Sequence, residues 1–212
     1  MTFIYLHGWA SGPFSNKARF FKQRFAQQGL TLQIPDLNQN DFFHLTLSRQ
    51  IQQVKNLLPS QPVTLIGSSF GGLTALWVAE QQPQVERLVL LAPALDFADR
   101  CLTLLPEEQQ TQWRDQGVLN IYHYAEEREL PLSFDFIKDV KGYHDDHLQR
   151  CIPTLILQGI HDEVVPIHAS RNFVKTRNWV ELIELNSDHS LANVQEQLWQ
   201  ALCSFCQLNY TS

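Results

Sequence analysis

The sequence is poor in cysteine. Four cysteines occur among 212 residues, at positions 101, 151, 203 and 206. This scarcity excludes a small scaffold held together by disulfide bonds and is typical of proteins in a reducing compartment. Cys203-x-x-Cys206 lies in a helical pattern and has no second cysteine pair to complete a site. We therefore interpret these two as buried core thiols rather than half of a zinc site or a redox motif.

Basic clusters and long apolar runs are also missing. Lys and Arg number 16 against 22 Asp and Glu, which gives a net charge of −6. This balance argues against nucleic acid or an anionic membrane as a partner. No apolar run approaches ~18 residues, so the sequence predicts no membrane-spanning helix. The first residues enter a strand pattern without a basic leader, so we expect a cytoplasmic location.

Short apolar runs alternate with helical patterns along the chain. Hydrophobic residues make up 44% of the sequence, enough for a full core. Most predicted strands are apolar on both faces, which indicates a mostly parallel sheet of about six strands with helices on both faces. The predicted strands are 3–6, 30–34, 62–66, 85–92, 153–157 and 180–185. The predicted helices are 15–28, 41–58, 73–82, 168–176 and 191–207.

One stretch breaks this alternation. About sixty residues, 94–152, separate the fourth and fifth predicted strands, and an ordinary connection is far shorter. We interpret the chain as a single domain, 1–212, with a cap-like insertion at about 94–152 that lies over the strand ends. A detached surface decoration is the alternative.

A short corner between a strand and a helix carries the strongest chemical signal. Gly67-Ser68-Ser69-Phe70-Gly71 reads Gly-x-Ser-x-Gly with Ser69 at its centre. A nucleophile on such a tight turn is strained, and Gly67 and Gly71 would lie where a Cβ clashes. The alternative is an ordinary Gly/Ser-rich turn that binds nothing or cradles a phosphate. The sequence here has neither the Gly-x-Gly-x-x-Gly spacing of dinucleotide sites nor the Lys of a P-loop.

A serine nucleophile needs a base and an acid. Asp162 follows the strand predicted at 153–157, and His189 follows the strand predicted at 180–185. Because the carboxyl ends of parallel strands share one edge of the sheet, we expect both to lie near Ser69. Asp96, after the fourth strand, is the rival acid, and His161 is the rival base.

The tetrahedral intermediate of acyl transfer also needs two N–H donors. The loop His7-Gly8-Trp9 follows the first predicted strand. We assign the donors to the backbone N–H groups of Trp9 and Phe70, with the Ala10 N–H as the alternative to Trp9. His7 is expected to brace this loop without transferring a proton.

Taken together, these motifs resemble the α/β-hydrolase superfamily over essentially the whole chain. The motifs that carry the resemblance are His7-Gly8-Trp9, Gly67-x-Ser69-x-Gly71-Gly72, Gly159-x-x-Asp162-x-x-Val165-Pro166 and Asp188-His189-Ser190. The short N-terminal part is similar to the small bacterial esterase-like YqiA/YcfP branch. The sequence differs from the fuller family in starting at what would be the third strand. The resemblance implies the α/β-hydrolase fold and a catalytic triad of Ser69, Asp162 and His189.

The function expected from these residues is a serine hydrolase that cleaves small carboxylic esters or thioesters through an acyl-enzyme. A cofactor-free lyase, a small peptidase on the same fold and a non-catalytic binding protein are the alternatives. The expected partner is a small ester or thioester; we expect no cofactor and no metal, and the oligomeric state stays open. His144-Asp145-Asp146-His147 contains metal-ligand residue types, but we interpret it as a solvated turn.

Overall fold

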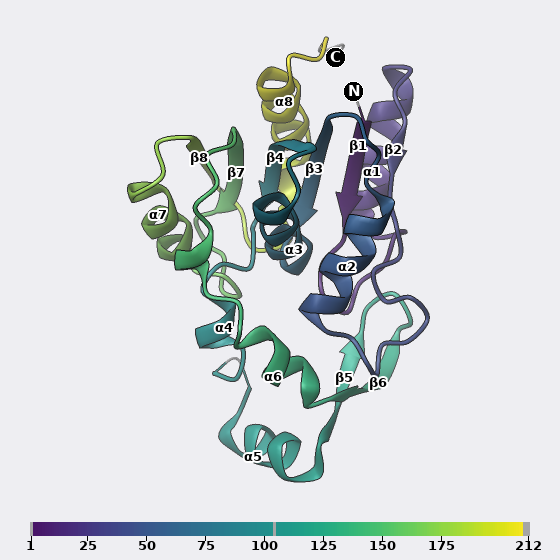
Figure 1. Cartoon of the computed structure of the whole chain (residues 1–212), viewed down its shortest axis with the longest axis vertical. Helices are drawn as coiled ribbons and strands as arrows, with labels where there is room; N and C mark the ends of the chain where they lie inside the picture. The colour runs from purple at the N-terminus through teal and green to yellow at the C-terminus, as the bar shows by residue number, and fades with distance from the viewer. Residues whose placement is uncertain (1, 104, 210–212) are drawn as a thin grey trace.

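The computed structural model describes residues 2–103 and 105–209 and is built around a six-stranded sheet (Figure 1). The strands run in the order β2-β1-β3-β4-β7-β8, and every pair is parallel. Their bounds are β1 Thr2–Leu6, β2 Leu32–Gln33, β3 Val63–Ser68, β4 Val85–Leu91, β7 Thr154–Gly159 and β8 Val180–Leu185. The parallel sheet predicted from the apolar runs is thus confirmed.

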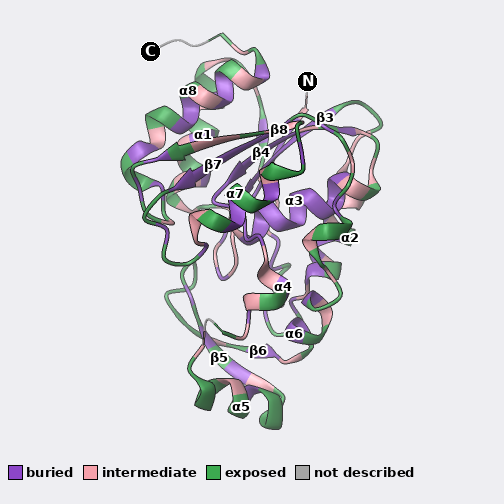
Figure 2. Cartoon of the chain, turned by 90° about the vertical axis from the view of Figure 1, so that its left-hand side faces the viewer, coloured by how far each residue is buried: buried purple, intermediate pink, exposed green. Residues whose placement is uncertain are grey.

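Helices cover both faces of this sheet. The helices α1 (Asn16–Gln27) and α8 (Gln195–Cys206) contact each other on one face. The opposite face carries α2 (Leu47–Leu57), α3 (Phe70–Gln81) and α7 (Ile167–Lys175). Figure 2 shows β3, β4, β7 and α3 largely buried.

The alternation of side chains along each strand explains the two cores. In β1, Phe3 and Tyr5 pack into the core beneath α1 and α8, whereas Ile4 and Leu6 pack into the core on the α3 side. All four side chains are almost fully buried. Successive residues of a strand point to opposite faces, so an apolar run with both sets buried requires cover on both sides. Cys203 and Cys206 are buried in the α8 core, as expected.

Two local predictions differ from the structure. The second helix was expected from residue 41, but α2 begins at Leu47, where the Thr46 hydroxyl accepts a hydrogen bond from the Arg49 N–H at 3.1 Å. Such a side-chain cap fixes the start of a helix more firmly than apolar periodicity does. The strand predicted at 30–34 pairs only over two residues. Phe14, in the loop before α1, is 76% exposed.

The segment between β4 and β7 lies beyond the carboxyl ends of the strands (Figure 1). It contains α4 (Phe97–Arg100), α5 (Glu107–Gln116), the antiparallel hairpin of β5 (Val118–His123) and β6 (Arg128–Ser133), α6 (Asp135–Val140) and the 3-10 turn η1 (Asp145–His147). The hairpin was not predicted, because β6 has a proline and two charged residues and therefore little strand signal. No helix in the described part of the chain has the length and apolarity needed to cross a membrane.

Candidate functional site

Ser69 occupies a strained corner between β3 and α3. Its backbone has φ 53° and ψ −118°, a conformation that residues with a side chain rarely adopt. A Cβ on Gly67 would approach the Gly71 carbonyl oxygen to 2.5 Å, and one on Gly71 would approach the His7 carbonyl oxygen to 2.5 Å. Only glycine fits these two positions, so the pentapeptide is tied to this turn geometry.

The fold brings three residues of distant loops into one hydrogen-bonded row. His189 Nε2 lies 3.0 Å from Ser69 Oγ, and His189 Nδ1 lies 2.7 Å from Asp162 Oδ2. Ser69 follows β3, Asp162 follows β7 and His189 follows β8, so all three stand at the carboxyl edge of the sheet. A neutral imidazole that donates from Nδ1 to the carboxylate leaves Nε2 free to accept the serine proton.

Asp162 is held in a buried position. Its side chain has no exposed surface, and Oδ1 accepts the N–H groups of Val164 at 2.9 Å and Val165 at 2.7 Å. His189 keeps 24% of its side chain exposed and can therefore meet a substrate. Buried carboxylates of this kind are stable only when their oxygens are hydrogen-bonded.

The rival acid and base lie elsewhere. The Asp96 N–H donates to Asp145 Oδ2 at 2.8 Å, and burial raises the pKa of Asp145 to about 6. His161 Nε2 lies 3.0 Å from Asn186 Oδ1 on the exposed side of the loop. Neither residue joins the row of Ser69, His189 and Asp162.

A lysine supports the loop that carries His189. Lys17, at the start of α1, donates from Nζ to the Ser190 carbonyl oxygen at 2.9 Å. Burial lowers the pKa of this amine to about 8, although the negative charges of Asp162 and Asp188 act in the opposite direction. The contact ties the loop after β8 to the first helix of the chain.

The loop after β1 lies against Ser69. A Cβ on Gly8 would come within 3.4 Å of the Ser69 Cβ. His7 donates from Nδ1 to the Gly8 carbonyl at 2.9 Å and accepts the Leu37 N–H at Nε2, also at 2.9 Å, so both ring nitrogens are engaged in bracing the loop. The backbone N–H of Trp9 has no acceptor within residues 2–103 and 105–209. The Phe70 N–H, at the first position of α3, has no intrahelical acceptor either.

An apolar cavity of about 110 Å³ opens beside Ser69. Its walls include Trp9, Phe70, Trp113 and Phe136, and the Trp9 ring stacks on that of Phe136 with 5.8 Å between centroids. Residues 94–152 also carry four aromatic side chains that lie away from this cavity. Tyr122, Tyr124, Phe134 and Tyr143 do not line it.

Several wall residues were not identified from the sequence. These are Ala94, Leu95, Phe97, Arg100, Cys101, Leu105, Ile137, Val164 and Val165. Ala94 and Leu95 come shortly after β4, and Val164 and Val165 shortly after β7. For these four, the position after strands that end at the same edge is the signal that would have found them.

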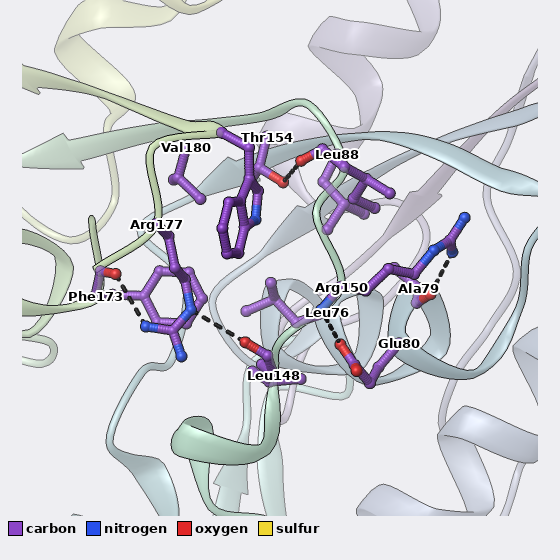
Figure 3. Close-up of a pocket in the computed structure, with 12 residues that line it drawn as sticks. Leu76, Ala79, Glu80, Leu88, Leu148, Arg150, Thr154, Phe173, Arg177 and Val180 are labelled. Atoms are coloured by element: carbon purple, nitrogen blue, oxygen red, sulfur yellow. Dashed lines mark hydrogen bonds between the residues drawn. The ribbon is translucent and has the colours of Figure 1, made fainter. Parts of the chain in front are cut away.

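A second cavity, between α3 and α7, has different properties (Figure 3). It measures about 20 Å³, room for roughly one water molecule. Arg177 stacks on Phe173 and donates to the carbonyl oxygens of Leu148 at 3.1 Å and Phe173 at 3.0 Å, while Arg150 donates to Ala79. Both guanidinium groups thus donate their hydrogen bonds to backbone carbonyl oxygens. We interpret this cavity as a small gap in the packing and not as a substrate site.

The stretch 144–147 does not gather into a metal site. Within the residues that the structure describes, no group of three or more His, Cys, Asp or Glu side chains is placed to hold an ion. His144 and His147 are both exposed and lie near carboxylates at 3.9 Å. His144, Asp146 and His147 are thus on the solvated side of the turn, whereas Asp145 is partly buried against the Asp96 N–H.

Comparison with known proteins identifies the family to which the chain belongs. A family model described as "Uncharacterised protein family (UPF0227)" matches residues 2–207. The chain belongs to this family. The match confirms the similarity to the YqiA/YcfP branch. A search among curated proteins gave no match.

Solved structures share the fold at low sequence identity. A presumptive hydrolase of Agrobacterium vitis S4 is 22% identical with a TM-score of 0.83, covering 96% of this chain and 87% of its own. Alpha/beta hydrolase domain-containing protein 10 from mouse is 22% identical, with a TM-score of 0.77 and coverage of 97% and 88%. Est1E from Butyrivibrio proteoclasticus, solved with ferulic acid bound, is 17% identical, with a TM-score of 0.81 and coverage of 97% and 88%. The UPF0227 chain therefore has the α/β-hydrolase fold.

Proposed function

We propose that this protein is a serine hydrolase that cleaves small carboxylic esters or thioesters. The observation that carries the proposal is the row Ser69–His189–Asp162, with separations of 3.0 and 2.7 Å at the edge of the sheet. This order of nucleophile, base and acid matches the geometry of acyl-transfer sites. The names of neighbours with this fold, which include an esterase and a monoacylglycerol lipase, agree with the reaction class.

In the proposed reaction, Ser69 Oγ attacks the carbonyl carbon while His189 Nε2 takes the hydroxyl proton. Asp162 holds the imidazole in the correct tautomer and stabilises its positive charge. The oxyanion accepts hydrogen bonds from the free N–H groups of Trp9 and Phe70, and the amino end of α3 adds a favourable dipole. His189 returns the proton to the leaving alcohol or thiol, and water then releases the acyl group by the same steps.

We further propose that residues 94–152 cap the site within one domain. Phe136 of α6 packs against Phe70 beside the nucleophile with 5.5 Å between ring centroids, and Trp113 of α5 stacks on Phe136 at 6.3 Å. The segment thus supplies part of the cavity wall. An apolar, partly enclosed wall suits an acyl chain, whereas the open His189 side suits the leaving group.

A fluorophosphonate probe tests the proposal. It should form one adduct on Ser69, and Ser69→Ala should lower ester turnover by roughly 10⁴-fold or more. Ser68→Ala is the matched control, since Ser68 is the adjacent buried serine on β3 and should still be labelled at residue 69. An adduct mapped to Ser68, or a wild-type protein that neither labels nor turns over any ester, would refute the serine hydrolase proposal.

A further inference from the structure

We propose that Gln158 is a positioning residue for Asp162 and His189. Its side-chain amide holds the Asp162 carboxylate against His189 and reduces the negative charge on that carboxylate. The inference rests on the proposed function and adds a residue to it. Gln158 lies in β7, four residues before Asp162, and has no exposed surface. Its Nε2 donates to Asp162 Oδ2 at 2.6 Å, the same oxygen that His189 contacts.

The neighbours of Gln158 fix the orientation of its amide. Besides Asp162 Oδ2, Nε2 donates to the Val165 carbonyl oxygen at 3.1 Å. Both partners are acceptors only, so an NH₂ group must face them. On the other side, the buried Ser170 hydroxyl of α7 donates to Gln158 Oε1 at 3.1 Å. A turned amide would place its oxygen against the oxygens of Asp162 and Val165 and lose both of these bonds.

Gln158 completes the set of donors around a buried carboxylate. Asp162 Oδ1 accepts two N–H groups, from Val164 and Val165, and Oδ2 accepts Gln158 and His189. A carboxylate has about four acceptor positions, and all four are filled here. Because the Asp162 side chain has no exposed surface, water cannot replace a missing donor. Without the amide, Oδ2 would be free to turn away from His189.

The amide also affects the charge that His189 meets. A donor on Oδ2 withdraws negative charge, so it weakens the attraction between the carboxylate and a protonated imidazole. The charged groups around this pair are Lys17 on α1, Asp188 beside His189 and the exposed Glu163 beside Asp162. None of them changes when Gln158 is replaced. Loss of the amide should therefore favour the protonated base and move the rise of activity to higher pH.

Two substitutions at Gln158 separate positioning from packing. In Gln158→Leu, kcat/KM should fall by about 10- to 100-fold, mainly in kcat, because one hydrogen bond to a buried charge is lost. The acid limb of kcat/KM should move up in pH. Gln158→Glu keeps the shape but sets a second carboxyl group against Asp162. Two buried carboxyl groups this close share one proton, so the new carboxyl group donates to Oδ2 in place of the amide, and the acid limb should stay near that of wild type.

The matched control is Gln50→Leu. Gln50 is 1% exposed and accepts a hydrogen bond from the Thr74 hydroxyl at 2.9 Å, so the substitution removes a buried amide of the same kind. It should lower the melting temperature as Gln158→Leu does and leave the pH profile unchanged. If Gln158→Leu does not fold, Ser170→Ala is the replacement variant. Loss of the Ser170 hydroxyl leaves the Gln158 amide free to turn, so kcat should fall several-fold, as expected for Gln158→Leu.

An NMR titration of the His189 ring gives a readout that does not need turnover. Its midpoint should rise from wild type to Gln158→Leu and stay near the wild-type value in Gln158→Glu and Gln50→Leu. A midpoint and pH profile in Gln158→Leu equal to those of Gln50→Leu would overturn the positioning role while leaving the serine hydrolase intact. If the wild-type protein neither labels nor turns over any ester, the proposed reaction is refuted. The Gln158 contact would still be tested separately, by the NMR titration of His189.

Discussion

Under the proposed function, the cavity beside Ser69 should set an upper limit on acyl length. An apolar cavity of about 150 Å³ accommodates benzene, with six carbons. In proportion, the cavity of about 110 Å³ holds roughly four carbons beyond the ester carbonyl. Each buried methylene contributes about 0.8 kcal/mol, or close to fourfold in rate. From acetate to pentanoate, three methylenes should raise kcat/KM by about 60-fold.

The assay is kcat/KM for p-nitrophenyl esters from acetate to palmitate. We expect the fastest hydrolysis within two to six acyl carbons, a decline by octanoate and slow cleavage of emulsified long-chain triglycerides. Longer chains decline because the buried walls of Trp113 and Phe136 leave them no further apolar surface. A maximum at twelve carbons or more, or activation at a lipid interface, would refute this reasoning and identify residues 94–152 as a lipase-type lid.

A cavity-enlarging variant tests the same wall directly. Ile137 lies on α6, is 1% exposed and lines the cavity, so Ile137→Ala should move the optimum to esters about two carbons longer. Ile51→Ala is the matched control, because Ile51 is 3% exposed in the same core but lies on α2 away from the cavity. Both variants should lose about 2–5 kcal/mol of stability. An unchanged optimum in Ile137→Ala would show that the acyl chain lies elsewhere.

Three further predictions follow from individual residues. Asp162→Asn should lower kcat by about 10⁴-fold in the ester assay, because the amide selects the wrong tautomer of the base, and a larger loss in Asp96→Asn would reassign the acid. Burial raises the pKa of Asp145 to about 6, so the folded state binds more protons than the unfolded state between about pH 4 and 6. The free energy of unfolding therefore falls as pH rises through this window. Denaturation by urea should therefore show Asp145→Asn more stable than wild type by about 1–3 kcal/mol at pH 7 but not at pH 4, and equal curves at both values would contradict the burial argument. Gly71→Ala should abolish ester turnover or folding, because its Cβ would meet the His7 carbonyl oxygen, and a stable, fully active variant on circular dichroism and assay would refute the close approach.

The sequence was informative about the sheet because parallel strands have a strong local signature. Runs such as Val63–Ile66 are apolar on both faces, which leaves a doubly covered sheet as the arrangement that buries them. The elbow was equally local, since Gly67 and Gly71 are demanded by backbone contacts within a few residues of Ser69 and with the end of β1. Chain order alone then predicted that Asp162 and His189 would share one edge with Ser69.

Local signals were weaker in the insertion. The β5–β6 hairpin has little strand propensity, and its position is fixed by long-range bonds, such as those from the Tyr124 N–H to the Ala10 carbonyl and from the Ser133 N–H to the Phe43 carbonyl. Which aromatic side chains wall the cavity depends on how the helices pack, and this selected Trp113 and Phe136 over the exposed Tyr124.

The sequence by itself determined the parallel sheet, the strained corner at Ser69 and the order of the strand-end residues, because each follows from apolar periodicity or backbone sterics over a few residues. Only the tertiary structure placed Asp162 rather than Asp96 against His189, set the volume of the cavity and placed the Gln158 amide on Asp162 Oδ2. These features depend on contacts between side chains on different elements. Their geometry exists only after the helices, the loops and residues 94–152 have packed against the sheet.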